Sequence, residues 1–472
     1  MSRLILSASC LAALSFVGIA GSFAAATSDP FPTPIVADED VIVVEFTEFA
    51  RIPSVDGEAA RMMTMIEEPG TGRMFLSDQR GMLYNIGDGG EVSLYLDVNQ
   101  AVSVAAPWRE MGVQSFAFHP QFAEAGTPGY GKFYIWSDTP PAPDPDFKTS
   151  ASSPTHDTVL WEWAAADAHA KTYGGAEPRE VVRMQQPYAN HNGGGIAFNP
   201  LAEADDPDFG LLYIGNGDGG SGGDPLGLAL DLRSSFGKIL RIDPLGSNST
   251  NGQYGVPADN PFAGEGQADA LGEIYAYGLR NPQHLVWDVK TGDMLVSDIG
   301  QNTVEEVSIV TRGANLGWND WEGSFRFVGR GGVDDAAPRG DAGVSFPFVE
   351  YDQQDPLFGD GVAVTGLHVV RNGAISALQD RVLFGELVSG ELFYVDADDR
   401  PDGGQEAIRR VLFDDGSGEP RTLLDLVREK NRDQGRDPVN RVDLRLGAAS
   451  GGRIFLLNKH DGTLRMLVPP NA

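Results

Sequence analysis

The sequence predicts an all-β protein and, more narrowly, a six-bladed β-propeller with loop insertions. Three observations support this prediction. Glycine makes up 59 of the 472 residues without a collagen-like period, which indicates many turns. One short strand pattern recurs six times, and amphipathic helical patterns are rare. A β-sandwich is the alternative architecture for the same set of short strands.

The recurring unit is a small turn, a short apolar strand and then a small or acidic residue. Its copies are "TGRMFLSD" from Thr71, "YGKFYIWSD" from Tyr130, "DFGLLYIGNGD" from Asp208, "TGDMLVSD" from Thr291, "QDRVLFGE" from Gln379 and "GGRIFLLNK" from Gly451. Some copies follow another short strand, as in "FAFHP", "IAFNP" and "LVWDV", so each unit reads as a hairpin. Six hairpin units separated by unequal insertions predict a propeller of six blades.

Two further segments complete the predicted architecture. We expect "VIVVEFTEF", near the N-terminus, to pair with the final blade and close the ring. The stretch "RTLLDLVREKNRDQ", near residue 421, is the best helical pattern, and we interpret it as an insertion. The predicted organisation is a signal peptide over 1–26, a lead-in over 27–40 and a single propeller over 41–472.

The N-terminal stretch "MSRLILSASCLAALSFVGIAGSFAAATS" is typical of a secretory signal peptide. Arg3 supplies the positive end, and small residues after the apolar run offer a cleavage site. A transmembrane anchor is the alternative, but small residues weaken the run and no basic stop follows it. Cleavage would remove Cys10, the only cysteine, and leave no disulfide. We therefore expect a periplasmic or secreted protein without a stable membrane anchor.

The chain is strongly acidic, with a formal net charge of −32. Such a charge argues against nucleic acid and anionic lipid as partners, because both would be repelled. The same surface would attract divalent cations, and it is also typical of proteins that stay soluble in saline surroundings.

A glycine-rich loop, "GNGDGG", spans Gly215–Gly220 and matches G-x-G-x-x-G after a strand. A dinucleotide site would need a helix to begin there, but "SGGDPLG" follows and prevents one. What remains is a loop that carries Asp218 and Asp224. From the local sequence alone it is a surface turn, a calcium loop or part of a catalytic site.

Other polar motifs also allow a structural and a functional interpretation. In "PYANHNGGGIAFNP", His191 precedes three glycines that either form a turn or make room for a large flat ligand. In "YAYGLRNPQHLVWD", Arg280 and Asn281 suit a carboxylate or carbonyl pair, although most arginines form surface ion pairs. The stretch "SDIGQNTVEEV" contains Gly300 and Gln301 in an oxygen-rich turn that suits Ca²⁺.

Together these motifs resemble one family. From about Gly112 to Gly323 the chain is similar to the glucose/sorbosone dehydrogenases, soluble quinoproteins that use pyrroloquinoline quinone. The similar stretches, in the family's order, are "GVQSFAFHPQF", "HNGGGIAFNP", "LYIGNGDGGSGGDP", "FGKILRIDP", "GVPADNPF", "EIYAYGLRNPQ", "SDIGQNTVEEV" and "GANLGWNDWEG". "LVSGELFYVD" and "RVDLRLGAASGGRIFLLNKHDG" extend the similarity more loosely. The family's fold is a six-bladed propeller.

The resemblance implies oxidation of an aldose-type sugar at its anomeric carbon, with hydride transfer to the quinone. His191 corresponds to the family's general base, a role that suits an imidazole near neutral pH. Asp218 corresponds to the acid beside that base, and Glu110 to a sugar-pocket position. Gly193–Gly195 would then keep side chains away from the cofactor and the sugar.

The resemblance also implies two cofactors. Arg280 and Asn281 correspond to the pair that binds the quinone, which carries three carboxylates. Gly300 and Gln301 correspond to positions whose backbone carbonyls hold a Ca²⁺ that polarises the quinone. We expect His191, Asp218, Glu110, Arg280 and Gly300 to face one pocket.

The chain departs from the family in the last two blades. Better-known members carry a lysine in the fifth blade, where this chain has Val388 and Ser389 in "FGELVSGEL". Their last-blade Arg-x-Arg pair is replaced by Arg441 and Arg445, with Lys459 further on. We expect Arg441 or Arg445 to approach a cofactor carboxylate. Candidates for an aromatic residue that stacks on the cofactor are Phe358 and Trp318.

Two other functions remain open at this level. One is a non-catalytic carbohydrate- or protein-binding propeller, and the other is a Ca²⁺-dependent propeller lactonase. An oxidoreductase would also require an external electron acceptor, which the sequence does not identify. A homodimer is compatible with the sequence, which does not fix the oligomeric state.

Overall fold

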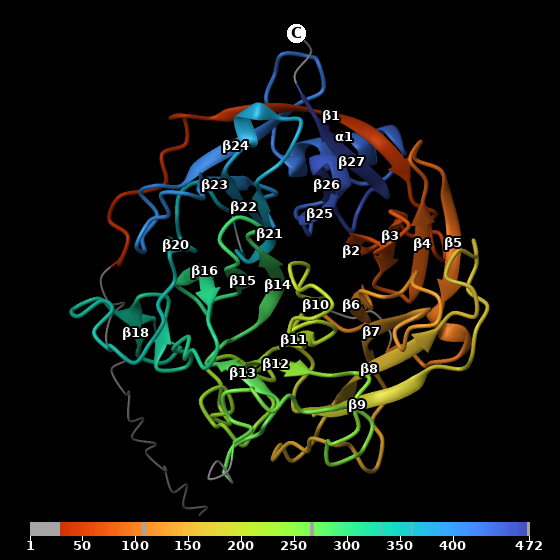
Figure 1. Cartoon of the computed structure of the whole chain (residues 1–472). Coiled ribbons are helices and arrows are strands. Elements are labelled where there is room, and N and C mark those ends of the chain that lie inside the picture. Colours follow the sequence, from red (N-terminus) through yellow and green to blue (C-terminus); the bar gives the residue numbers. More distant parts are fainter. Residues whose placement is uncertain (1–28, 106–109, 265–268, 331, 360, 470–472) are drawn as a thin grey trace, which may run out of the picture.

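A computed structural model of the protein describes residues 29–105, 110–264, 269–330, 332–359 and 361–469. The regular elements of these residues are almost all β-strands, and the sheets are arranged around a common centre in a propeller-like fold (Figure 1). The predicted signal peptide, residues 1–26, lies outside the described residues, as do the first residues of the lead-in. Within the described part of the chain, no helix is long and apolar enough to cross a membrane.

Four of the sheets contain four antiparallel strands each. The first contains β2 (Met62–Glu67), β3 (Met74–Asp78), β4 (Met82–Ile86) and β5 (Val92–Asp97). The second contains β6 (Val113–Phe118), β7 (Lys132–Thr139), β8 (His156–Ala164) and β9 (Arg179–Gln186). The third contains β10 (Ile196–Phe198), β11 (Leu212–Asn216), β12 (Lys238–Ile242) and β13 (Ile274–Tyr277). The fourth contains β14 (Pro282–Trp287), β15 (Met294–Asp298), β16 (Val304–Val310) and β20 (Val349–Asp352).

An eight-stranded sheet completes the circle, with the strand order β21-β22-β23-β24-β1-β27-β26-β25. Its strands are β21 (Val364–Val370), β22 (Arg381–Glu386), β23 (Leu392–Asp396), β24 (Arg409–Asp414), β25 (Arg445–Ala449), β26 (Arg453–Leu457), β27 (Thr463–Val468) and β1 (Ile42–Arg51). β1 pairs with β24 in parallel and with β27 antiparallel. The predicted pairing of the N-terminal strand with the last strands is therefore confirmed.

The remaining elements are insertions between these strands. A small sheet contains β17 (Trp321–Glu322), β18 (Phe325–Phe327) and β19 (Val333–Asp334). Short 3-10 turns occupy Val98–Gln100, Ser376–Leu378 and Ser450–Gly452. The single α-helix in the described residues, α1 (Leu423–Asp433), coincides with the predicted insertion. Thr422 caps it by accepting a hydrogen bond from the Asp425 backbone N–H, while the Asp425 carboxylate accepts one from the Thr422 N–H.

All six copies of the repeated sequence pattern form the second strand of a hairpin, namely β3, β7, β11, β15, β22 and β26. The turn before each of these strands contains a residue with positive φ, which favours glycine. Examples are Gly131 (φ 70°) and Gly452 (φ 70°), and Asp380 (φ 56°) takes this conformation before β22. The glycine-rich turns therefore reverse the chain where each sheet begins its second strand.

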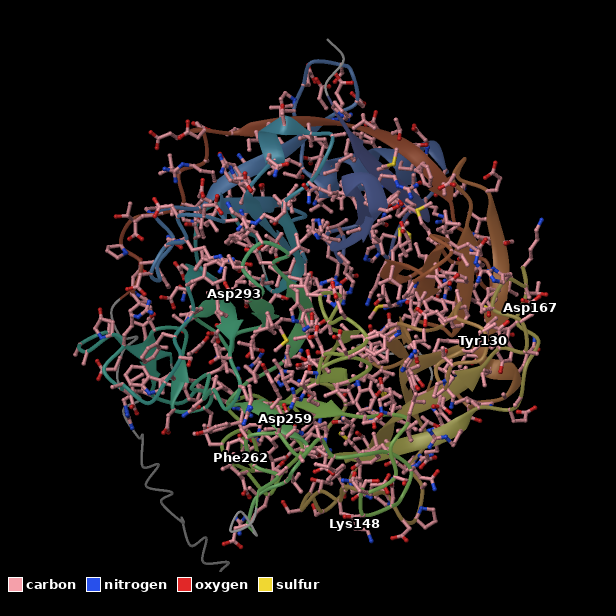
Figure 2. The ribbon with its side chains drawn as sticks, in the orientation of Figure 1. Tyr130, Lys148, Asp167, Asp259, Phe262 and Asp293 are labelled. Atoms are coloured by element: carbon pink, nitrogen blue, oxygen red, sulfur yellow. The ribbon has the colours of Figure 1, made fainter. Side chains whose placement is uncertain are left out.

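The first strands of the hairpins lie innermost and contact one another around the centre. β2 contacts β6 and β25, β10 contacts β6 and β14, and β21 contacts β14 and β25. Clusters of buried apolar side chains fill the spaces between neighbouring sheets, and charged residues such as Lys148 and Asp167 lie at the rim (Figure 2). The loops that precede the inner strands consequently converge near the centre.

Candidate active site

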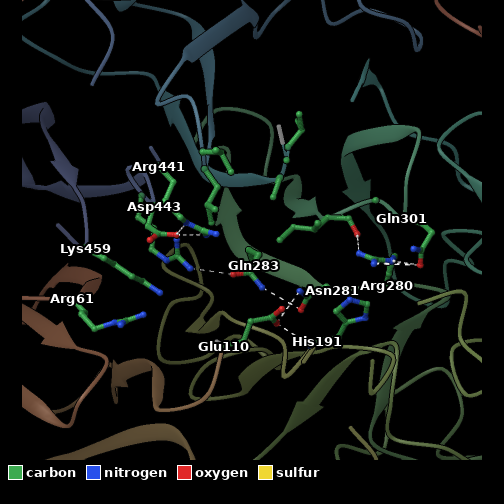
Figure 3. Close-up of a pocket in the computed structure, with 18 of the residues that line it drawn as sticks. Arg61, Glu110, His191, Arg280, Asn281, Gln283, Gln301, Arg441, Asp443 and Lys459 are labelled. Atoms are coloured by element: carbon green, nitrogen blue, oxygen red, sulfur yellow. Dashed lines mark hydrogen bonds and ion pairs between the residues drawn. The ribbon is translucent and has the colours of Figure 1, made fainter. Parts of the chain in front are cut away.

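A pocket of about 560 Å³ lies near the centre of the fold. Eight of the nine residues predicted to form a site line it: Glu110, His191, Arg280, Asn281, Gly300, Gln301, Arg441 and Arg445. Most of them precede or follow inner strands, so loops far apart in the sequence meet there. Figure 3 shows His191, Glu110 and Asn281 between a cationic side, with Arg61, Arg441 and Lys459, and an opposite side with Arg280 and Gln301.

The ninth residue, Asp218, does not line the pocket but lies behind His191. Its Oδ1 is 2.7 Å from His191 Nδ1, and both side chains are buried. Burial alone would raise the pKa of Asp218, but the neighbouring His191 and Arg280 and the Gly220 N–H lower it overall. An ionised carboxylate only accepts hydrogen bonds, so the His191 proton resides on Nδ1. In the neutral imidazole Nε2 is then the acceptor nitrogen, and it has no hydrogen-bond partner among the described residues.

The expectation that Asp218 itself faces the pocket is therefore wrong, and the reason is geometric. Asp218 follows β11, the second strand of its sheet, whereas His191 precedes the inner strand β10. The carboxylate consequently lies one layer further from the centre than the imidazole. Asp218 contacts the ring from the side opposite to the pocket.

Trp318 holds the other oxygen of Asp218. Its indole Nε1 donates a hydrogen bond to Oδ2 at 2.8 Å, and the Arg280 guanidinium lies 5.7 Å from the indole ring. Trp318 is fully buried and does not line the pocket, so it does not occupy the position of a stacking residue. The sequence offered only "LGWNDW" as a signal, which does not reveal this contact with a loop 100 residues earlier.

Phe358, the other stacking candidate, is also absent from the pocket lining. It packs between two sheets, with its ring 5.6 Å from that of Tyr351 and 5.9 Å from that of Phe393. Val388, which replaces the family's lysine position, does line the pocket. An apolar side chain therefore forms this part of the pocket wall.

Glu110 joins two of the predicted residues. Its Oε2 accepts hydrogen bonds from the His191 backbone N–H at 2.8 Å and from Asn281 Nδ2 at 3.3 Å. Asn281 in turn accepts a hydrogen bond from Gln283 Nε2 at 3.2 Å. These contacts fix the backbone at His191, whose φ of 58° lies in the left-handed region.

Arg280 is buried, and hydrogen bonds hold both its backbone and its guanidinium. Its backbone N–H, and that of Asn281, donate hydrogen bonds to the carboxylate of Asp298 at 2.8 and 2.6 Å. The guanidinium donates to the Ile299 carbonyl at 2.9 Å and lies 3.3 Å from Gln301 Oε1. The Arg–Asn pair and the "SDIGQN" turn are thus one connected unit.

The turn at Gly300 and Gln301 is held by a neighbouring carboxylate. Glu322 Oε1 accepts hydrogen bonds from the backbone N–H groups of Gln301, Asn302, Thr303 and Val304, which holds the turn in place. Among the described residues, the carbonyls of Gly300 and Gln301 accept no hydrogen bond. The same residues contain no group of three or more His, Cys, Asp or Glu side chains that could hold a metal. A cation here would therefore depend on backbone oxygens.

The opposite side of the pocket is cationic. Arg445 is buried, lies 3.4 Å from Gln283 Oε1, and its Nη1 has no hydrogen-bond partner within the described part of the chain. Arg441 is paired with Asp443, whose other oxygen lies 2.8 Å from His460 Nε2. Lys459 is buried, and its burial, with repulsion from Arg445, lowers its pKa to about 7. The buried Nη1 of Arg445 is the type of unsatisfied donor that an anionic ligand would satisfy.

The three glycines after His191 have a different role from the predicted one. None of Gly193–Gly195 lines the pocket. A Cβ at Gly193 would lie 2.2 Å from the Gly215 carbonyl oxygen, and one at Gly194 would lie 2.6 Å from that of Gln283. The expectation that they clear space for the cofactor is therefore wrong. Gly193 allows the backbone to approach β11 of the same sheet, and Gly194 allows it to approach β14 of the neighbouring sheet.

Comparison with known proteins agrees with this arrangement. The family model of the glucose/sorbosone dehydrogenases matches residues 59–414. The chain belongs to this family. The HIPL1 and HIPL2 proteins of Arabidopsis thaliana are 28% and 29% identical to it over 408 and 372 residues, which are 77% and 70% of this chain. The matched parts are 56% and 51% of those two proteins, so the chain spans about half the length of these curated relatives.

A solved structure of the same general fold is the PQQ-bound form of aldose sugar dehydrogenase from Streptomyces coelicolor. It superimposes with a TM-score of 0.53 at 20% identity, covering 88% of this chain and 97% of that one. At this identity the similarity concerns the fold, and the residues of the pocket carry the chemical argument.

Proposed function

We propose that the protein is a quinone-dependent sugar dehydrogenase that oxidises an aldose at its anomeric carbon. The observation that carries this proposal is the environment of His191. This residue lines the pocket, and its Nδ1 is held by the buried Asp218, which leaves Nε2 as the acceptor nitrogen. A buried, ionised carboxylate behind an imidazole is the arrangement of a general base. Family membership supports the same assignment.

The residues present fit pyrroloquinoline quinone and Ca²⁺. The free Nη1 of Arg445, together with Arg441 and Arg280, would pair with the carboxylates and carbonyls of the quinone. The free carbonyls of Gly300 and Gln301 would bind Ca²⁺. When bound, the quinone would accept the hydride, and Ca²⁺ would increase its electrophilicity.

The chain's own residues would supply the proton chemistry and the alignment. His191 Nε2 would take the proton of the anomeric hydroxyl as the hydride leaves the same carbon, so that the C–O bond becomes a carbonyl. Asp218 would stabilise the resulting imidazolium, and Trp318 would keep Asp218 in place. Glu110 would accept a hydrogen bond from a sugar hydroxyl through Oε1, which has no partner among the described residues.

The proposal also includes the number of blades, export of the protein and an electron acceptor. The eight-stranded sheet would count as two blades joined by β1, which with the four other large sheets gives six blades over residues 41–472. Residues 1–26 would direct export to the periplasm or beyond the cell. Reduced cofactor would pass its electrons to an external acceptor.

Dye reduction tests the proposal. Protein stripped of ligands, then supplied with quinone and Ca²⁺, should reduce an artificial acceptor when an aldose is added and not when either cofactor is omitted. Absorbance after dialysis separates the alternatives, since a binding propeller would retain no quinone. Hydrolysis of a lactone in the absence of an acceptor would instead support a lactonase.

A further inference from the structure

A second cleft adjoins the candidate active site. It has a volume of about 800 Å³ and lies between the loop before β2 and the segment that follows α1. It shares Arg61, Lys459 and His460 with the first pocket, so the two cavities have a common wall. In Figure 3 Arg61 and Lys459 lie side by side at the edge of the first pocket, on its cationic side.

The charge of this cleft is opposite to that of the molecule. Arg61, Arg80, Arg436 and Lys459 line it, against Glu58 and Asp437. Across both cavities the lining contains seven Lys and Arg but four Asp and Glu, whereas the whole chain has 35 Lys and Arg and 67 Asp and Glu. Basic residues are therefore concentrated at this place, against the composition of the chain.

Only some of these cations are neutralised within the protein. Arg80 forms a two-point ion pair with Asp78 and donates to the carbonyls of Val55 and Ala59. By contrast, Arg61, Arg436 and Lys459 have no ion pair among the described residues. Lys459 is only 9% exposed and donates to Gln79 Oε1 at 3.1 Å, and the Arg436 guanidinium reaches only Ser54 Oγ at 3.5 Å.

Binding of a neutral sugar would not require the unpaired cations of this cleft. The hydroxyl groups of a neutral aldose are bound by any polar side chain, and keeping a lysine buried without a counterion costs free energy. The proposed cofactor's carboxylates would meet Arg441 and Arg445 in the first pocket. The cations on the shared wall and beyond it are therefore left to another anionic group.

We infer that the second cleft is a subsite for a carboxylate on a second sugar residue, so that the enzyme prefers acidic oligosaccharides. This inference rests on the proposed function, since the reducing-end sugar would react beside His191. The next unit, a uronic acid, would extend past Arg61 and Lys459 and pair with Arg436. The guanidinium groups of Arg61 and Arg436 can each bind a carboxylate through two nitrogens.

The test compares a disaccharide of glucuronic acid linked to a reducing-end glucose with the methyl ester of the same disaccharide, which removes its single charge. Protein reconstituted with quinone and Ca²⁺ is mixed with each sugar without an electron acceptor, and reduction of the cofactor is followed by absorbance. The apparent sugar dissociation constant should be at least about 10-fold lower for the acid, as expected for one charge-assisted contact. Arg436→Gln should remove this preference.

Arg432→Gln is the matched control. It removes the same charge, but Arg432 is exposed on α1 and does not line the cleft. It should leave the preference for the acid unchanged. Equal constants for acid and ester in the wild type, or an unchanged preference in Arg436→Gln, would overturn the inference. So would an Arg436→Gln variant whose only defect is in quinone affinity or in reoxidation by ferricyanide.

Failure of the proposed function is distinguishable from failure of the subsite. If no sugar reduces the bound quinone, the dehydrogenase proposal is wrong, and calorimetric titration with the glucuronyl-glucose disaccharide still tests the cleft. Binding that is weakened about 10-fold in Arg436→Gln and unchanged in Arg432→Gln would support the subsite. Absence of binding to the wild-type protein would overturn it.

Discussion

At the scale of single residues, the proposed role of His191 as a base depends on groups that a solvent-exposed histidine lacks. Asp218 fixes its tautomer, and Trp318 and the Gly220 N–H fix Asp218. Glu110 holds the backbone of His191 from the pocket side. The imidazole is thus held from two directions, which orients Nε2 before a substrate arrives.

Asp218→Asn should retain quinone binding but lower turnover by about 10²- to 10⁴-fold, because an amide neither stabilises the imidazolium nor selects the Nδ1 tautomer. Steady-state rates at saturating sugar measure the effect. Asp224→Asn, in the same loop and away from His191, serves as the control and should stay within a few-fold of the wild type. Equal losses in both variants would show that the loop acts only structurally.

Lys459 predicts a pH dependence of the affinity for the acidic disaccharide. Its pKa of about 7 in the folded protein, against ~10.4 for an exposed lysine, means that the side chain loses its charge above pH 7. An anionic ligand favours the charged form, so the affinity for the glucuronyl-glucose disaccharide should fall above pH 7, by at most about tenfold per pH unit. Dissociation constants measured from pH 6 to 9 test this. In Lys459→Met the dependence should be absent, and a slope that persists there would assign it to another group.

The site positions that could be found from the sequence are those that lie in a local motif. His191, Arg280 and the Gly300 turn stand beside strands in distinctive motifs. Trp318, Asp298 and Lys459 act through contacts between segments far apart in the chain, which a local motif does not encode. The direction of Asp218, behind the histidine, is equally a product of sheet order.

At the scale of elements, each repeated hairpin places the loop before its first strand near the centre. The distance between these loops depends on how closely the backbones of adjacent strands approach each other. The six second strands were predictable because each is a short apolar run that directly follows turn-forming residues, and in the structure these turns contain a residue with positive φ. The role of Gly193–Gly195 was not, since their closest neighbours belong to β11 and β14 and not to the adjacent sequence.

Gly194→Ala should destabilise the fold, since its Cβ would lie 2.6–3.0 Å from backbone atoms of Gln283. Overpacking of this kind costs about 1–3 kcal/mol in the free energy of unfolding, which urea titration measures. The same change at Gly174, where nothing lies within 4 Å of the added atom, should be nearly neutral. A Gly194→Ala variant as stable as Gly174→Ala would show that the two sheets can separate without cost.

At the scale of the whole molecule, β1 joins the two ends of the chain. It lies between β24 and β27, which makes one eight-stranded sheet from strands that otherwise belong to two groups. Val44 of β1 is completely buried in the adjacent apolar cluster. The circular arrangement around the pocket therefore depends on an N-terminal strand.

Val44→Asp should lower the free energy of unfolding by at least about 3 kcal/mol, because it buries a carboxylate without a partner. Val43→Asp, one residue away on the other face and 39% exposed, should change it by less than about 0.5 kcal/mol. Thermal or urea unfolding compares the two. Similar small effects in both variants would mean that β1 is not needed to hold the circle together.

The central claim is that His191 removes a proton while the sugar gives hydride to a bound quinone. Rapid mixing of the reconstituted protein with an aldose, without acceptor, tests it by following the absorbance of the quinone. The wild type should reduce its cofactor, and His191→Ala should bind quinone equally well but react about 10²- to 10⁴-fold more slowly. Reduction at the wild-type rate in His191→Ala, or no reduction of the wild-type cofactor by any aldose, would contradict the claim.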